Sequence, residues 1–588
     1  MQQKTGPEKP LRAPLWNKFP SWSLLAMTLC TWVCVALCVD PAGSYPGRPQ
    51  GPGLTVDEIF NVEQGVYLIE QTRALGWLNL VPGTSQEAYR PQNGYNPDHP
   101  PLGRFWLGLH HHLTWWLSPP RDPAGIAVTA CARTGSATAL ALLVLLLGTV
   151  ATKWSGKGVG VMTALSVVLM PRLFGHAHLA SLETVTNLTC SAAVLAVAAG
   201  WNGVARPSLK WAVFAGVLLG LAFLTKIQAI MIPIPVICWT LWRWGRRGLP
   251  VLVVWGLAAF VVFIASWPYL WIDPFAHLKE YLGRTTDRMT LYVWYFGQRY
   301  ADKSVPWHYP SLMFLMTVPL ILHFVGGVGL FSRTLQTRSV SKDSDNKTPL
   351  AGGRGVVQAP SASLTPEFYR DTLLLGCLVF PLLVFSLPGV AVYDGERLFL
   401  TSFPLWAIFV GRGWQSLDHW LADRFKSPVV AKAGCLLLLV CAAYPLVTFS
   451  PCHLCYYNSV ERMLSRFQQD DAPLFEIDYW GEGVTRELLQ ELVAVVPANS
   501  TVGITPTLHQ FQADDYRNQS PVLRSHGIKF VEFSPDQPRP DYLLVYRRLA
   551  DQSFPGTSGS AGEIVAKTTR DGRLLAYLLR LGPQSGTP

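Results

Sequence analysis

Apolar runs of membrane-spanning length recur along this 588-residue chain, and they constrain its fold more than any other feature. Charged residues make up only 15% of the chain, whereas soluble proteins carry about a quarter. Runs of this kind are typical of helices that cross a lipid bilayer. We therefore predict a mainly α, polytopic membrane bundle of about eleven spans, at residues 22–39, 126–151, 159–171, 184–200, 211–225, 228–242, 249–271, 310–331, 371–388, 399–414 and 432–449.

The charges in the loops between these runs predict an orientation. When the chain is threaded through the membrane, every second loop is basic, as at 153–157, 206–210, 243–247 and 412–432. The opposite loops carry most of the acids. Because basic loops stay on the cytoplasmic side, we expect a multi-pass protein of the inner membrane. The net charge of +10 then reflects topology, and no nucleic-acid partner is expected.

The first run, 22–39, follows several basic residues and allows two interpretations. A signal peptide is one of them. The run is long enough to span the membrane, however, and the "DPAGSYPG" that follows it is a poor cleavage site. We therefore expect an uncleaved anchor behind a cytoplasmic N-terminal tail at residues 1–21.

The rest of the chain divides into two predicted domains. Residues 22–449 form the membrane domain, with the outer loop 40–125 and a flexible cytoplasmic loop at 332–370 that is rich in Ser, Gly and Pro. Residues 450–588 are predicted to be a small extracytoplasmic α/β domain. Its segments "TVGIT" and "DYLLVYR" alternate like strands, and Asp571–Gly572 has the composition of a hairpin turn.

Most of the eleven cysteines lie inside apolar runs, where a thiol acts as a small hydrophobe. Cys452 and Cys455, in "PCHLCYY", lie just beyond the last run. A disulfide and two free thiols both remain open. A structural zinc would need two further ligands, and none stands at a convincing spacing.

Candidate chemical residues gather in the outer loops. Asp57 and Glu58 begin a stretch of helical periodicity that is typical of a helix at the membrane surface. The decapeptide "YNPDHPPLGR" follows, and its prolines hold Asp98 and His99 on a rigid turn before Arg104. An acidic first helical turn and a plain connecting loop are the alternatives for these two segments.

Further polar residues are expected on the same side of the membrane. An acid at a membrane edge needs a partner or a function, and a lone cation there suits a phosphate, although snorkelling to the interface is the alternative. Aromatic side chains in outer loops suit sugar faces as well as an ordinary aromatic belt. These candidates are Arg172, His176, His178, Glu183, Lys226, Trp271, His308 and Arg397.

The order of these motifs resembles glycosyltransferase family 39 of the GT-C superfamily. "VDE" followed by "DHPPLGR" is similar to elements of the protein O-mannosyltransferases, and "GLAFLTK" to a stretch of the lipid A aminoarabinose transferases. "PRLFGHAHLASLET", "WPYLWIDP", "PWHYP" and "FEIDYWG" resemble bacterial members of family 39. The likeness covers most of residues 22–482.

This resemblance implies an integral-membrane enzyme that takes a sugar from a polyprenyl-phosphate carrier. It implies Asp57 as catalytic base, with Glu58 as a second acid, and Lys226 as a contact of the carrier phosphate. Glu58 and Glu183 match acidic positions where some relatives bind a divalent metal. Arg104 stands where the mannosyltransferases have Lys, and the β-trefoil insert of the eukaryotic enzymes is missing, which puts a protein acceptor in doubt.

The resulting hypothesis is an inverting sugar transfer to an acceptor hydroxyl at the outer face. Lys226, with Arg172 or Arg397, would stabilise the phosphate leaving group. The expected acceptor and sugar cavity is lined by Asp98, His99, Arg104, His176, His178, Trp271 and His308. A lipid, a glycan and a protein all remain open as acceptors. A multi-pass secondary transporter is the alternative function.

Overall fold

The computed structural model describes residues 21–76, 81, 83–286, 289–345, 365–466, 473–506, 509–533, 539–551 and 562–581. The tail predicted at 1–21, except for its last residue, and the middle of the loop predicted at 332–370 lie outside these residues.

Each predicted apolar run forms helix in the structure. The bundle helices are α1 (Trp22–Leu37), α4 (Thr129–Ser155), α5 (Lys157–Val168), α7 (Glu183–Gly200), α8 (Leu209–Phe223), α9 (Pro233–Trp244), α10 (Leu249–Ala265), α13 (Tyr309–Thr317), α14 (Leu320–Asp345), α15 (Pro366–Phe385), α16 (Ser402–Phe425) and α17 (Pro428–Thr448). The run predicted as one span at 310–331 is instead a pair of helices, α13 and α14, bent by 105°. Pro319 precedes α14, and proline both removes a backbone donor and favours such a break.

The number of spans stays a prediction. Among the described residues, four helical stretches are long and apolar enough to cross a membrane, or five if α13 and α14 count as one span. Three further apolar helices, α1, α5 and α8, are shorter. The protein is therefore an integral membrane protein with several spanning helices, and the count of about eleven rests on sequence alone.

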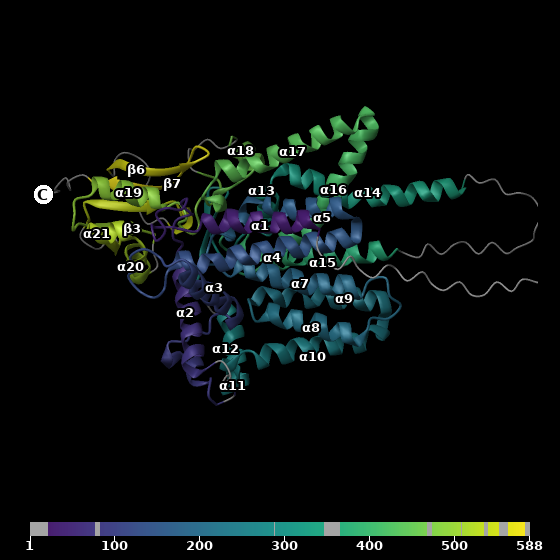
Figure 1. The fold of residues 1–588 in the computed structure, drawn as a ribbon, viewed down its shortest axis with the longest axis horizontal. Helices are drawn as coiled ribbons and strands as arrows, with labels where there is room; N and C mark the ends of the chain where they lie inside the picture. The colour runs from purple at the N-terminus through teal and green to yellow at the C-terminus, as the bar shows by residue number, and fades with distance from the viewer. Residues whose placement is uncertain are drawn as a thin grey trace, which may run out of the picture.

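The arrangement in Figure 1 separates the two ends of the bundle. The long helices run side by side, with the C-terminal sheet at one end. The connection between α16 and α17 and the far end of α14 lie at the opposite end. Both belong to loops that the charge pattern predicts to be cytoplasmic. The sheet and the acidic loops consequently share the other side of the bundle.

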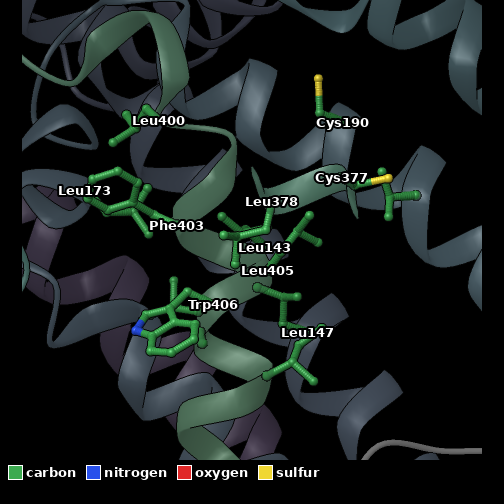
Figure 2. Close-up of a cluster of buried hydrophobic side chains, with 14 of the residues drawn as sticks. Leu143, Leu147, Leu173, Cys190, Cys377, Leu378, Leu400, Phe403, Leu405 and Trp406 are labelled. Carbon is green, nitrogen blue, oxygen red and sulfur yellow. The ribbon is translucent and has the colours of Figure 1, made fainter. Parts of the chain in front are cut away.

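Apolar side chains from distant helices form the core of the bundle (Figure 2). Leu143 and Leu147 of α4 pack near Leu378 of α15 and Leu405 and Trp406 of α16, and all five are at least nine-tenths buried. Moving a side chain of this size from water into a protein core contributes roughly 1.5–3 kcal/mol to stability. This core holds the bundle helices together and so supports the loops between them.

Other α-helices lie in the connections between and beyond the bundle helices. They are α2 (Glu58–Leu75), α3 (Pro101–Leu117), α6 (Pro171–His176), α11 (Pro268–Ile272), α12 (Pro274–Thr286) and α18 (Ser459–Ser465), with the hairpin β1 (Tyr292–Tyr295) and β2 (Gln298–Ala301). In Figure 1, α2 and α12 lie crosswise to the long helices. This placement agrees with the prediction that the segment after Asp57 lies along the membrane surface.

Helices α2 and α3 touch backbone to backbone at two glycines. A Cβ added at Gly108 would lie 1.9 Å from the carbonyl oxygen of Gly65, and one added at Gly65 would lie 2.7 Å from that of Arg104. Glycine is required at both positions because nothing larger fits between the helices. This contact sets how α2, and hence the residue before it, Asp57, is placed.

Gly108→Ala is therefore expected to destabilise the protein by about 1–3 kcal/mol, the usual cost of overpacking. The measurement is thermal unfolding of purified protein in detergent. Gly256→Ala is the matched control, because a Cβ on that helical glycine meets no atom within 4 Å. An unchanged melting temperature for Gly108→Ala would show that the two helices separate without cost.

The C-terminal segment folds around a five-stranded sheet. Its strand order is β4 (Lys529–Glu532), β3 (Thr501–Thr505), β5 (Tyr542–Tyr546), β7 (Arg573–Arg580) and β6 (Glu563–Arg570). Helices α19 (Arg486–Val495), α20 (Gln510–Gln519) and α21 (Pro521–Ser525) accompany it. The strands coincide with the alternating segments of the sequence. Asp571 and Gly572 both have positive φ, at 50° and 76°, as a two-residue hairpin turn requires.

Cys452 and Cys455 are both free and buried, at the junction between bundle and sheet. The backbone N–H of Cys455 donates to Glu482 Oε1 at 3.0 Å, and its thiol lies 3.2 Å from the same atom. Glu482 is fully buried, and its other oxygen has no hydrogen-bond partner among the described residues. Burial and the nearby Asp478 raise the pKa of Glu482 to about 8.

This pKa predicts a specific pH dependence of stability. Because the folded pKa lies above the unfolded one, protonated Glu482 stabilises the fold at low pH, and this contribution is lost as pH rises from about 4.5 to about 8. Glu482→Gln is expected to match the wild type near pH 5 and to exceed it at pH 9, by an amount on the order of 4 kcal/mol. Melting curves across this range test it, with the exposed Glu487→Gln as control; parallel curves for both variants would contradict it.

Candidate active site

Arg397 is the centre of a cluster of charged side chains at the sheet-facing end of the bundle. Its guanidinium donates through Nε to Glu183 Oε1 at 2.6 Å, and its two terminal nitrogens lie 2.8 Å from Asp394 Oδ2 and Asp57 Oδ2. Asp57 immediately precedes α2, Glu183 begins α7, and Asp394 and Arg397 precede α16. One planar cation thus joins three carboxylates from three separate parts of the chain.

Lys226 completes this cluster from a fourth segment. Its Nζ lies 2.5 Å from Glu183 Oε1, the oxygen that Arg397 also contacts. Lys226 follows α8 in an extended conformation, with φ −161° and ψ 151°, where the helix breaks. From this extended position the Lys226 side chain reaches Glu183 at the start of α7. Asp57 and Lys226, predicted from the sequence to meet, are therefore joined through Glu183 and Arg397.

Asp57 is the member of this set that reaches solvent. Its side chain is 30% exposed, against 10% for Arg397, 5% for Lys226 and 2% for Glu183. The cations consequently lie behind a carboxylate that an incoming molecule meets first. Such an order suits a proton acceptor in front of a binding site for an anion.

The C-terminal unit supplies two residues that the sequence predictions missed. Trp480 donates its indole N–H to Asp394 at 3.2 Å, and its ring lies 4.4 Å from the guanidinium carbon of Arg397. Arg548 contacts the other oxygen of Asp394 at 3.2 Å. The motif "FEIDYWG" contained a signal for Trp480, whereas nothing in the local sequence distinguishes Arg548 from its neighbour Arg547.

Two predicted residues lie beside the cluster. Arg104 is buried and donates to the carbonyl of Asn96 at 2.7 Å, while its charge acts on Asp57. His99 is partly buried, and burial, followed by the charges of Arg104 and Lys226, lowers its pKa well below the ordinary value of 6.5. His99 is therefore a neutral imidazole at neutral pH, able to accept or donate a hydrogen bond beside the cations.

Arg172 and His176 lie beneath the cluster, enclosed by protein. Arg172 is fully buried, pairs with Glu396 at 2.7 Å and donates to the carbonyl of Tyr456 at 3.0 Å. His176 packs edge-on against Trp480. The prediction that Arg172 contacts a phosphate is not favoured by this geometry, because a buried carboxylate already holds its guanidinium.

Glu58 faces away from its neighbour Asp57. It is fully buried, and Arg133 contacts its two oxygens at 2.8 and 2.6 Å. The backbone N–H groups of Ala180 and Thr55 donate to the same carboxylate. Glu58 thus anchors α2 to α4 rather than lining the cluster, and the geometry does not favour the catalytic role predicted for it.

The predicted metal ligands do not fit a divalent ion. Both oxygens of Glu58 are engaged by Arg133, and Glu183 is held by Lys226 and Arg397. Among the described residues, no group of three or more His, Cys, Asp or Glu side chains is arranged to hold a metal. A divalent cation would first have to displace the guanidinium or ammonium groups that hold these carboxylates, so no step is derived through a metal.

The other predicted cavity residues lie elsewhere. Asp98 is exposed and pairs with Arg284 of α12. Trp271 donates its indole N–H to the backbone carbonyl of Ile264, seven residues earlier, at 2.7 Å. His178 stacks on His453, and His308 lies 2.6 Å from the hydroxyl of Tyr295. None of these four residues contacts Arg397 within the described part of the chain.

Comparison with known proteins supports the resemblance found in the motifs. Residues 64–281 match the family model of dolichyl-phosphate-mannose-protein mannosyltransferases. Over this segment, which is less than half of the chain, the match agrees with the predicted resemblance to the mannosyltransferases. The matched segment contains Arg104, Glu183 and Lys226, while Asp57 and Arg397 lie outside it. No curated protein matches the chain significantly.

Two solved membrane proteins are similar in structure at low identity. ArnT from Cupriavidus metallidurans, bound to undecaprenyl phosphate, is 15% identical with a TM-score of 0.42, over 95% of this chain and 98% of that one. The archaeal oligosaccharyltransferase AglB from Archaeoglobus fulgidus, in complex with an inhibitory peptide and a dolichol-phosphate, is 10% identical with a TM-score of 0.45, over 89% and 69%. TM-scores this low establish neither a shared fold nor a shared activity.

Proposed function

We propose that this protein is a membrane glycosyltransferase that moves a sugar from a polyprenyl-phosphate carrier to an acceptor hydroxyl at the outer face. The observation that carries the proposal is the ion cluster in which Arg397 joins Asp57 to Glu183 and Lys226. The carboxylate of Asp57, which is 30% exposed, lies in front of the cations Arg397 and Lys226 at one end of the bundle. The family match over residues 64–281 supports the same activity.

Asp57 is the proposed base. An acceptor hydroxyl is a poor nucleophile near neutral pH, and a carboxylate within hydrogen-bond reach takes its proton as the new bond forms. The acceptor oxygen bonds to the anomeric carbon from one face while the bond to the phosphate oxygen breaks on the other. One displacement of this kind inverts the configuration at that carbon.

Arg397 and Lys226 are the proposed partners of the leaving phosphate. The electron pair of the broken bond goes to the phosphate oxygen, which needs positive charge rather than a proton. In the structure both cations are occupied by carboxylates. A carrier phosphate competes with Asp57 and Glu183 for Arg397, so donor binding frees Asp57 to act as base. Asp394, fixed by Trp480 and Arg548, keeps Arg397 in place during this exchange.

The proposed orientation follows the charge pattern. Arg548, which follows strand β5 closely, contacts Asp394 of the cluster, and Figure 1 shows the sheet at the end of the bundle opposite the α16–α17 connection. Because the loops at that opposite end are basic, the reaction is placed on the outer leaflet of the inner membrane. The C-terminal unit is then extracytoplasmic and supplies part of the site.

The test separates an enzyme from a transporter. Purified protein in detergent is given a panel of labelled polyprenyl-phosphate sugars and a membrane extract as the source of acceptor. An enzyme releases the carrier phosphate and labels the extract, in proportion to protein and time. A transporter leaves every donor intact, and that result for the whole panel would overturn the proposed function.

A further inference from the structure

A cavity borders helix α2, and its lining contains none of the residues that contact Arg397. It has a volume of about 440 Å³, within the range of small-molecule sites. Its wall is formed by α2, by residues 122–129 and by α20 of the C-terminal unit. Its apolar and aromatic lining includes Ile59, Val62, Val66, Tyr67 and Ile126.

The charges of this cavity are all of one sign. Its lining contains four carboxylates and no Lys, Arg or His side chain. Two of the carboxylates have partners outside the lining, since Glu70 pairs with Arg73 and Asp122 pairs with Arg524. The other two, Glu63 and Asp515, have no ion-pair partner within the described part of the chain.

Asp515 holds its position through a hydrogen-bonded frame. Gln519 donates to Asp515 Oδ1 at 3.0 Å and to the carbonyl of Ala127 at 3.0 Å, and it accepts from the backbone N–H of Thr129 at 3.1 Å. The second oxygen of Asp515 has no hydrogen-bond partner among the described residues. A fixed carboxylate with one oxygen unused is thus built into the wall.

An independent observation also points to a ligand. Thr129 lines the same cavity, is fully buried, and its hydroxyl has no hydrogen-bond partner among the residues described. Buried hydroxyl groups are normally satisfied, since an unmade hydrogen bond costs about 1–3 kcal/mol. Thr129 therefore adds an unused hydroxyl group to the wall that also carries Glu63 and Asp515.

We propose that this cavity binds a primary amine carried on an apolar or aromatic body. The ammonium group pairs with Asp515 and Glu63 and donates to the hydroxyl of Thr129, while the body packs on the apolar face of α2. Burial raises the pKa of Asp515 to about 7, and burial also raises the pKa of Glu63. A bound cation offsets this cost of burying charge.

The probe for this site is dansylcadaverine, a fluorescent primary amine on an aromatic body. The full-length protein in detergent is titrated and the emission change is followed. Asp515→Asn and Glu63→Gln are each expected to weaken binding about tenfold, the usual worth of one charged hydrogen bond. Glu63→Gln is informative by itself, because this side chain is exposed and forms no hydrogen bond or ion pair within the described residues that folding would lose.

The controls separate a site from partition into the micelle. Asp514→Asn, one residue away on α20 but outside the lining, is expected to bind the probe as the wild type does. Dansylamide, which lacks the ammonium group, is expected to bind about tenfold more weakly than the amine. Equal affinity of both probes, or of wild type and both lining variants, would overturn the proposal whether or not the protein transfers sugar.

Discussion

Asp57→Asn is expected to abolish sugar transfer while leaving the protein folded. The amide keeps the size of the carboxylate but cannot take a proton from the acceptor, so the rate should fall by about 10²–10⁴-fold. The side chain is 30% exposed and contacts Arg397 at one oxygen, which makes a large loss of stability unexpected. The measurement is the rate of carrier-phosphate release from a labelled donor.

The matched control for this variant is Glu87→Gln in the same outer loop. Glu87 is an exposed acid whose ion pair with Arg90 is at the surface, so its removal should change neither rate nor melting temperature. Donor binding to Asp57→Asn should be near normal or tighter, because a competitor for Arg397 is weakened. Retained transfer in Asp57→Asn would remove this residue from the role of base.

Arg397→Gln is expected to cause the largest combined loss of activity and stability. Glutamine leaves Glu183 and Asp394, both nearly buried, without the guanidinium that joins them. Breaking a buried ion pair from one side costs about 3–5 kcal/mol. Transfer should fall as well, because the leaving phosphate loses a bridging cation. Melting curves and donor turnover are the two readouts.

Two further variants define the role of Arg397. Arg397→Lys keeps the charge but lacks a planar fork, so it should recover part of the stability and little of the activity. Arg284→Gln is the surface control: this arginine also contacts two carboxylates, Asp98 and Glu280, but it is 42% exposed and should cost at most about 1 kcal/mol. A melting temperature that is the same in Arg397→Gln and Arg284→Gln would contradict a central structural role.

The sequence predicted the helical bundle, the strands of the C-terminal unit and the meeting of Asp57 with Lys226. Apolar runs and alternating patterns are local properties, so helix positions and strands follow from them. The charge of the loops orders the same segments across the membrane. The motif resemblance selected Asp57, Glu183 and Lys226, and the polar residues of the outer loops added Arg397.

Tertiary structure decided which groups each of the selected residues contacts. Asp57 and Glu58 are neighbours, yet successive residues at a helix start point about 100° apart, so one joins Arg397 and the other is buried against Arg133. Arg172 and Arg397 were equal candidates for the phosphate until packing enclosed Arg172 with Glu396.

The contribution of the C-terminal unit could come only from the three-dimensional fold. Trp480 and Arg548 reach Asp394 from more than eighty residues away in sequence, and no periodicity reports such a contact. The sequence by itself determined that this is a membrane bundle with charged outer loops, because hydrophobicity acts residue by residue. Which charges meet was decided by the tertiary structure, because pairing depends on where whole helices cross.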